Sequence, residues 1–188
     1  MAREGSHLLS TDLELIKRAR ADDPSAFHEL VDRHAGFLFA LAYSLCGNVA
    51  DAEDLVQEAF SGAFRGLRTF EGRASVKTWL ARILVRQVAR HFRSARRRKA
   101  EFVPIEEAAD THASAASPHA AADARIDVTA AIRSLGPEHQ EVIVLRELQG
   151  LSYEEIAEVL DIPRGTVESR LFRARRALQE RLKEYVDS

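Results

Sequence analysis

The chain has 188 residues, of which 46% are hydrophobic and 30% are charged, and its formal net charge is −2. This composition is that of a globular protein and excludes a largely disordered chain, and the length suits one or two small domains. No apolar run approaches the ~20 residues of a membrane-spanning helix, and the first residues lack the apolar segment of a signal peptide. We therefore expect a cytoplasmic protein with no membrane insertion and, since it has one cysteine, no internal disulfide.

Two helix-start signals occur in the first quarter of the chain. Thr11 and Glu14 form a T-x-x-E capping box, which predicts that a helix begins here. Asp23 and Pro24 then provide an N-cap and a proline at the first helical position, and Gly47 ends the helix that they begin. This second helix has an apolar stripe that should face a core, made of Phe27, Leu30, Val31, His34, Leu38, Leu41 and Leu45.

The next predicted helix, which begins near Asn48, has two distinct faces. Its apolar residues cluster on one side at about 100° per residue, while Asp51, Asp54, Gln57 and Glu58 gather on roughly the opposite side. Such an acidic stripe is typical of a solvated surface near a helix N-terminus, where it suits the helix dipole. A docking surface for a basic partner is the alternative, and spacing alone favours the solvated surface.

A long helix is predicted from Ser75 to Lys99, and it is strongly basic. No acidic residue lies between Glu71 and Glu101, although solvated surfaces normally mix both signs of charge. The pattern predicts a nucleic-acid surface with steep salt dependence, and the alternatives are contact with an acidic protein surface or an import-like basic run. The cationic residues are Arg73, Lys77, Arg82, Arg86, Arg90, Arg93, Arg96, Arg97, Arg98 and Lys99. The apolar stripe expected to be buried consists of Val76, Trp79, Leu80, Ile83, Leu84, Val88 and Phe92.

The composition changes after this helix, and residues 100–122 are rich in Ala, Ser and Pro and weakly periodic. This segment is typical of a linker between domains, and its charge is acidic. Helical periodicity resumes at residue 123, with Gly136 and Pro137 separating two helices. We therefore expect an all-α fold: two small helical domains, residues 11–99 and 123–188, joined by a flexible acidic linker. The residues expected to face the second core are Ile126, Val128, Ala131, Ile132, Leu135, Val142, Ile143, Leu145 and Leu148.

Residues 151–182 contain two helical patterns joined by a short turn. Ser152 and Glu155 form a capping box, so a helix should begin at Tyr153. Pro and Gly interrupt the pattern after it, and a longer arginine-rich helix follows from Thr166. This order predicts a helix-turn-helix that places its second helix in the DNA major groove, with a solvated amphipathic hairpin as the alternative.

Taken together, these motifs resemble the extracytoplasmic-function (ECF) sigma factors, the compact class of bacterial sigma factors that recruit RNA polymerase to promoters. DAEDLVQEAF resembles the polymerase-binding helix of that family, TWLARI resembles its promoter-melting segment, and LSYEEIAEVLDIPRGTVESRLFRARRAL resembles its DNA-reading helix-turn-helix. The motifs stand in the expected order and cover the chain from about Asp12 to Leu182. The resemblance implies three partners: core RNA polymerase, promoter DNA and an anti-sigma factor.

The resemblance also implies roles for individual residues. A loop at about Leu67 to Ser75 would form the pocket that captures a flipped base of the minus-ten element. Arg86 and Arg90 depart from the family, which usually has Asn and often Asp at these positions, so they support phosphate binding rather than base reading. The expected polymerase contacts are Asp51, Asp54, Gln57 and Glu58, supported by Phe60. The expected DNA contacts are Arg82, Arg86, Arg90, Arg93, Arg96 and Arg97 at the minus-ten element, and Thr166, Ser169, Arg170, Arg173 and Arg176 at the minus-thirty-five element.

Two other classes of protein are alternatives to a sigma factor. An autonomous helix-turn-helix repressor or activator would share only the C-terminal domain, and it needs neither the acidic helix nor the first basic helix. An enzyme has no support, because the sequence contains no catalytic motif, no phosphate-cradling glycine loop and no Cys/His metal set. We therefore expect no catalytic residues, no metal site and no cofactor.

Overall fold

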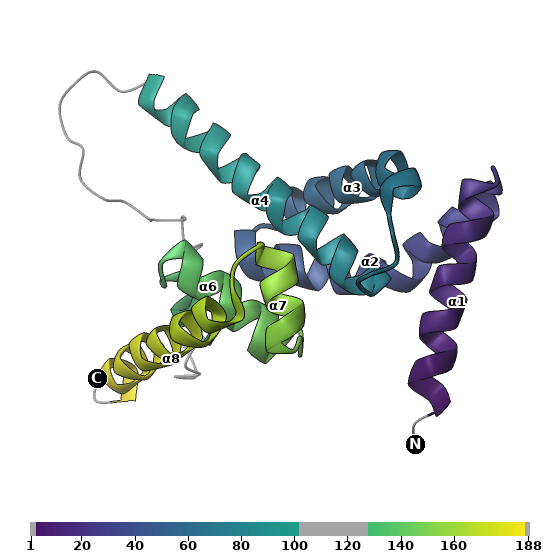
Figure 1. Ribbon diagram of the computed structural model, residues 1–188. Coiled ribbons are helices and arrows are strands. Elements are labelled where there is room, and N and C mark those ends of the chain that lie inside the picture. The colour runs from purple at the N-terminus through teal and green to yellow at the C-terminus, as the bar shows by residue number, and fades with distance from the viewer. Residues whose placement is uncertain (1–2, 102–127, 187–188) are drawn as a thin grey trace.

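The computed structural model describes residues 3–101 and 128–186, and in these ranges the chain is helical without a β-strand (Figure 1). The predicted all-α fold is therefore confirmed. The first range contains α1 (Arg3–Arg20), α2 (Pro24–Cys46), α3 (Val49–Gly66), the short η1 (Leu67–Thr69) and α4 (Val76–Glu101). The second contains α5 (Val128–Arg133), α6 (Pro137–Ile143), the π-helical turn η2 (Val144–Leu148), α7 (Tyr153–Leu160) and α8 (Arg164–Val186). The predicted linker lies outside the described residues, except for its first two residues, which continue α4.

Several helix ends are set by local side chains as predicted, but the predicted start of the first helix is wrong. Helix α1 begins at Arg3, so Thr11 and Glu14 lie within it and do not cap its N-terminus. Asp23 caps α2 by accepting a hydrogen bond from the backbone N–H of Ser25, with Pro24 following at the first helical position. Hydrogen bonds from Ser25, and then from Arg18, lower the pKa of Asp23 to about 2. Gly47 ends the helix in the left-handed conformation, at φ 75°, which costs glycine little.

The N-terminal domain packs α2, α3 and α4 against one another around a core of leucine and alanine side chains. Leu38, Leu41, Leu55 and Leu84 are among its fully buried residues. The predicted apolar stripes therefore face the core, with one error in α4. Phe92 is 41% exposed, because the C-terminal half of α4 projects beyond the bundle (Figure 1) and no neighbouring helix covers it.

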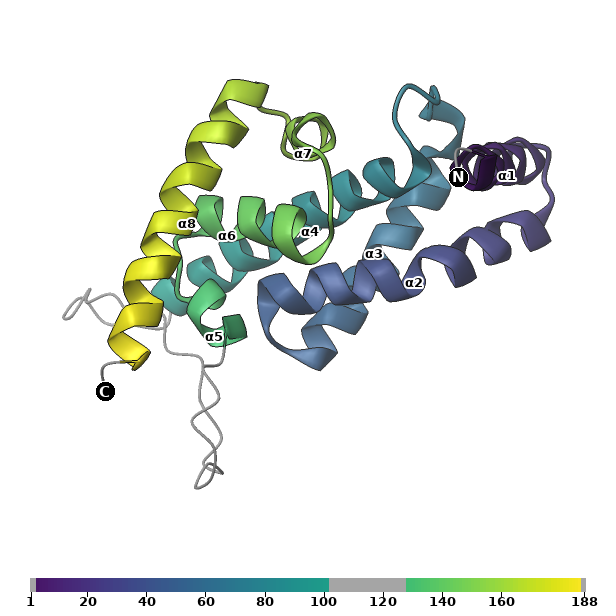
Figure 2. The same ribbon diagram turned by 90° about the horizontal axis from the view of Figure 1, so that it is seen from below.

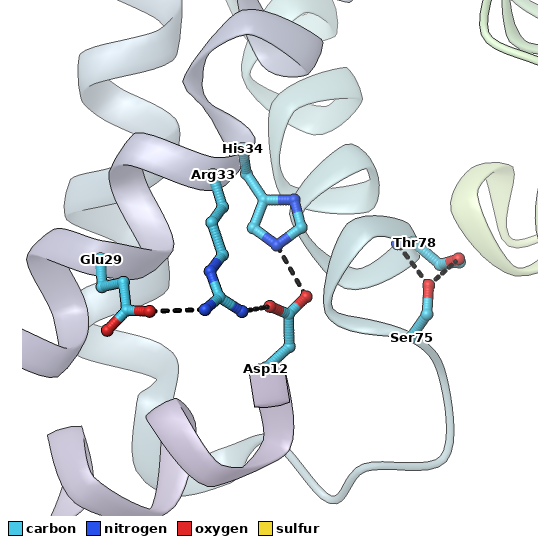
Figure 3. Close-up of polar contacts among 6 residues, drawn as sticks. All are labelled: Asp12, Glu29, Arg33, His34, Ser75 and Thr78. Atoms are coloured by element: carbon cyan, nitrogen blue, oxygen red, sulfur yellow. Dashed lines mark hydrogen bonds and ion pairs between the residues drawn. The ribbon is translucent and has the colours of Figure 1, made fainter. Parts of the chain in front are cut away.

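Helix α1 is joined to α2 by a small polar network (Figure 3). Asp12 lies at its centre: one carboxylate oxygen is 2.9 Å from Nε2 of His34 and the other accepts a hydrogen bond from Arg33 at 3.1 Å. Arg33 also pairs with Glu29 one turn earlier in α2. His34, which the sequence places on the core-facing stripe, thus contacts α1 through its ring nitrogen.

The C-terminal domain forms a second small core from α5 to α8. Val142, Ile143, Leu145, Ile156 and Leu171 are among its fully buried members. Two predicted core residues are wrong: Val128 and Leu148 are each 47% exposed. Val128 is the first residue of α5 and Leu148 is the last residue of η2, so each lies at a terminus of a short element. Ile126 lies outside the described residues.

The helix-turn-helix consists of α7 and α8. Ser152 and Glu155 form the predicted capping box, in which each side chain bonds the other residue's backbone N–H. The second helix begins two residues earlier than predicted, at Arg164 rather than Thr166. The carbonyl of Pro163 accepts hydrogen bonds from the N–H groups of Thr166 and Val167, so the proline that interrupts the pattern also starts the next helix.

The two domains pack together instead of standing apart. Helix α7 lies against α4, and α5 and η2 lie against α2, so the buried side chains of both domains form one continuous cluster. Figures 1 and 2 both show the C-terminal helices beside α4, with α1 at the opposite end of the molecule.

Candidate functional site

The acidic face of α3 is open to solvent. Asp54, Gln57 and Glu58 are exposed, while Asp51 is partly covered because its carboxylate lies 3.8 Å from Nε2 of His91 in α4. Phe60 is 8% exposed and belongs to the core beneath this face. The structure therefore brings the three exposed residues onto one surface and places Phe60 as their support.

An apolar groove of about 570 Å³ continues this acidic face between α2 and α3, and the sequence reasoning missed it. Phe64 is 58% exposed and packs edge-to-face on Phe27, with ring centroids 5.1 Å apart. Gln57 belongs both to the acidic face and to the groove lining. Gln57 and Phe64 are seven residues apart, so they lie two turns apart on the same side of α3. This spacing is the sequence signal that could have revealed the groove.

The predicted DNA contacts on α4 fall into two groups. Arg82 and Arg86 reach Asp161 in the turn of the helix-turn-helix, with Nη2–Oδ2 distances of 3.3 Å and 3.4 Å. The distal group consists of Arg90, Arg93, Arg96 and Arg97, all exposed. None of these four forms an ion pair with another side chain in the ranges 3–101 and 128–186.

The loop before α4 lines a pocket of about 470 Å³. The resemblance implies that a flipped base is captured at this place. Phe70 and Trp79 form one side, with ring centroids 4.7 Å apart. Arg20 at the end of α1 holds this loop by donating hydrogen bonds to the carbonyls of Leu67 and Phe70. The pocket lining is Thr69, Phe70, Glu71, Gly72, Arg73, Ala74, Thr78, Trp79 and Arg82, together with Glu158 from α7.

The start of α4 is fixed by Ser75, whose hydroxyl accepts a hydrogen bond from the N–H of Thr78 at 3.0 Å (Figure 3). The two hydroxyl oxygens are 2.8 Å apart. Thr78 is 2% exposed and its hydroxyl donates to Glu155 of α7 at 3.4 Å. The helix that carries the basic surface therefore begins at the contact between the domains.

On α8 the predicted DNA contacts separate into two sets. Ser169, Arg173 and Arg176 are exposed, and Arg176 pairs only with Glu180 one turn later on the same helix. Thr166 is half-buried at the start of the helix.

Arg170 belongs to the other set, because its side chain is 20% exposed and turns toward α6. There its guanidinium pairs with Glu138 at 3.1 Å. Burial raises the pKa of the nearby Glu141 carboxyl, and the charge of Arg170 opposes that shift. In this conformation Arg170 holds α8 to α6.

Phe172 is a residue of α8 that the sequence reasoning passed over. It is 70% exposed and lies between Leu171, which is buried, and Arg173, which is not. Most of this aromatic side chain is therefore open to solvent, beside an exposed arginine. Its position outside the stripe formed by Val167, Leu171 and Ala174 could have revealed it from the sequence.

Neither metal nor membrane features stand out in the described ranges. No group of three or more His, Cys, Asp or Glu side chains there could hold a metal ion. None of the described helices is both long and apolar enough to cross a bilayer. Cys46 is half-buried, and burial raises the pKa of its thiol.

Comparison with known proteins covers both domains. The Sigma-70 region 2 family matches residues 30–98 and the Sigma-70, region 4 family matches residues 125–178. The ECF RNA polymerase sigma-E factor of Escherichia coli is 36% identical over 92% of this chain and 94% of its own length. That of Haemophilus influenzae is 34% identical over 92% of this chain and 95% of its own length.

Two solved structures resemble most of the chain. CnrH, in complex with the cytosolic domain of CnrY, has a TM-score of 0.69 at 28% identity, over 93% of this chain and 98% of its own. The sigma factor RpoE of Bartonella quintana, in complex with the anti-sigma factor NepR, has a TM-score of 0.66 at 32% identity. This second match covers 84% of this chain and 96% of RpoE. The sequence, the two family regions and the fold agree, and the chain belongs to the ECF family of RNA polymerase sigma factors.

Proposed function

We propose that this sigma factor binds core RNA polymerase through α3, holds the minus-ten element with α4 and reads the minus-thirty-five element with α8. The proposal gives the chain a binding role and leaves bond formation to the polymerase. We assign these tasks to an N-terminal domain at residues 11–99 and a C-terminal domain at 123–188, joined by a linker at 100–122. A cytoplasmic location is part of the proposal, because its partners are polymerase and promoter DNA.

The exposed acidic face of α3 is the observation that carries the proposal. Asp54 and Glu58 form no ion pair within the described part of the chain, and Gln57 is exposed on the same face. A carboxylate surface without such partners suits a basic docking partner. The groove beside it adds an apolar centre to a polar rim, which is the composition of a specific interface.

Helix α8 carries the reading of the upstream element. Arg173 and Arg176 have the length and charge to reach phosphates or guanine edges in the major groove, and Ser169 can bond either. Phe172, exposed between them, suits apolar contact with a thymine methyl group. We exclude Arg170 from direct readout while it pairs with Glu138.

Control by an anti-sigma factor completes the proposal. Of the two structural relatives above, CnrH was determined with the cytosolic domain of CnrY and RpoE with the anti-sigma factor NepR, and both match most of this chain. We infer that an anti-sigma factor binds this chain and prevents it from binding core RNA polymerase.

Run-off transcription with purified bacterial core polymerase tests the function. We expect initiation from some members of a promoter library only when this chain is added. Tight binding to duplex DNA by the chain alone, without initiation from any member, would instead support an autonomous helix-turn-helix regulator.

A further inference from the structure

We propose that Gly165 is a positioning residue for the upstream element, because the absence of a side chain there lets the first turn of α8 lie directly against the DNA. The inference rests on the proposed function, in which α8 reads the minus-thirty-five element. It goes beyond that function by naming the residue that sets how deeply the helix enters the major groove.

The backbone conformation at Gly165 does not require glycine. Gly165 is the second residue of α8, and the glycines with positive φ are Gly47, Gly72 and Gly150. A glycine inside a helix is less favourable than an alanine, because it loses more conformational freedom on folding. The stability of α8 by itself therefore favours alanine at this position.

Packing within the protein does not require glycine at this position either. Apart from its two chain neighbours and the adjacent backbone of α8, no atom of the described residues lies within 4 Å of where a Cβ atom of residue 165 would be. Gly47 is the contrasting case, since a Cβ atom there would clash with the guanidinium of Arg133 and the backbone is left-handed. The reason for a glycine at position 165 thus lies outside the described part of the chain.

The open space over Gly165 lies on the side of α8 that the proposed function assigns to DNA. The opposite side of the helix is buried in the domain core through Val167 and Leu171. Figure 2 shows α8 along one edge of the molecule, with α7 leading into its first turn. The exposed residues on the outer side follow one another at helical intervals of four, three and four: Gly165, Ser169, Phe172 and Arg176.

Side-chain length increases along this outer side of α8. Gly165 has no side chain, Ser169 has a short hydroxyl group, and Arg176 has a long guanidinium group. The recognition helix of a helix-turn-helix contacts base edges mainly with its N-terminal residues. Short side chains at the first turn therefore let the helix backbone approach the DNA, and longer ones bridge a wider gap at the later turns. This gradient places the N-terminal end of α8 deepest in the groove.

Free space around a glycine is not sufficient to assign this role. Gly36 of α2 and Gly136, which precedes α6, also leave room for a Cβ atom. Neither lies on a helix side that carries the predicted DNA contacts. Gly36 is the matched control for Gly165, since it is exposed, lies inside a helix and belongs to α2, which has no DNA contact in the proposed function.

Gly165→Ala separates a glycine required by DNA from one required by the fold, because the two cases give opposite changes in stability. If DNA requires the glycine, alanine should raise the melting temperature of the chain by roughly 1–4 °C. The added methyl group projects about 1.5 Å from Cα, so it should hold the helix away from the groove and weaken DNA binding. Gly36→Ala should raise the melting temperature similarly without weakening DNA binding.

DNA binding is measured with the holoenzyme, reconstituted from the full chain and core polymerase. The probe is a fluorescein-labelled duplex promoter selected in the run-off library. We expect Gly165→Ala to raise the Kd for this promoter about five- to fiftyfold, the range typical of losing one base contact. On the same promoter with a scrambled minus-thirty-five element, Gly165→Ala and the wild type should bind equally, and their affinities for core polymerase should also be equal.

A promoter affinity of Gly165→Ala within about twofold of the wild type overturns the positioning role. A lower melting temperature, or failure to fold as judged by circular dichroism, also overturns it, because the fold would then require the glycine. An equal loss of affinity in Gly36→Ala or on the scrambled promoter has the same consequence.

The proposed function is judged separately, by initiation with the wild-type chain. Wild-type initiation together with unchanged binding by Gly165→Ala refutes the positioning role alone. Absence of initiation from every member of the library refutes the reading role of α8 as well.

Discussion

Arg20 provides the sharpest test of how the loop before α4, residues 67–75, is held. Its Nε donates to the carbonyl of Leu67 at 2.8 Å, and its Nη2 donates to the carbonyl of Phe70. One guanidinium thus spans both ends of the turn that contains η1. We expect Arg20→Ala to release this turn and to widen the pocket before α4.

The expected loss in the free energy of unfolding follows from these two hydrogen bonds. A hydrogen bond from a charged donor contributes about 1.5–3 kcal/mol when it is well shielded from water. Arg20 itself is exposed and water can replace it at the carbonyls, so we take about 1–2 kcal/mol for both bonds together. Arg20→Lys should lose roughly half of this, because a single ammonium does not reproduce the two-pronged geometry of a guanidinium.

Urea unfolding, backbone hydrogen exchange and strand affinity together measure the effect. Arg20→Ala should speed exchange in residues 67–74 and weaken binding of single-stranded DNA more than its loss of stability explains. Arg18→Ala is the matched control, since Arg18 lies on the same last turn of α1 but pairs with Asp23 instead of the loop. The reasoning is refuted if both variants change loop exchange equally, or if Arg20→Ala leaves it unchanged.

Three further outcomes follow from the structure. Ser152→Ala removes the capping box of α7 and should lower the free energy of unfolding by about 1 kcal/mol, measured by urea denaturation. Asp54→Ala combined with Glu58→Ala should weaken binding to core polymerase without lowering the melting temperature, because both side chains are exposed; unchanged affinity would remove the docking surface. Arg173→Ala should impair recognition of the upstream element in run-off assays, and a wild-type promoter preference in this variant would contradict its assigned contact.

Local chemistry explains most of what could be predicted about the helices. The capping residues Asp23, Ser152 and Glu155 act within a few positions of themselves, so their effect is visible in the sequence. The predicted start of α8 was wrong because Pro163 has two opposite local effects. A proline breaks a helix that precedes it, and it favours a helix that begins directly after it.

The sequence predicted which face of each helix is buried, but not how far along the helix this burial extends. Periodicity correctly directed Leu84 and Val88 of α4 toward the core, yet the same period assigned Phe92 to it as well. How far a neighbouring helix extends along α4 is a property of the assembled fold. Phe64 shows the opposite case, since it lies outside the main stripe but lines a groove that only two packed helices create.

By itself the sequence determined the helices, the sign of charge on each helix and, through ordered motifs, the family. These depend on residues close together in the chain or on patterns shared with relatives. Only the tertiary structure decided which charges meet. The acidic residues from Glu155 to Asp161 are equally compatible with solvent and with a basic partner. In the structure Gln140 and Arg133 hold the C-terminal domain on α2, and α7 lies against the basic helix α4. That choice rests on contacts between residues far apart in the chain, which no local pattern encodes.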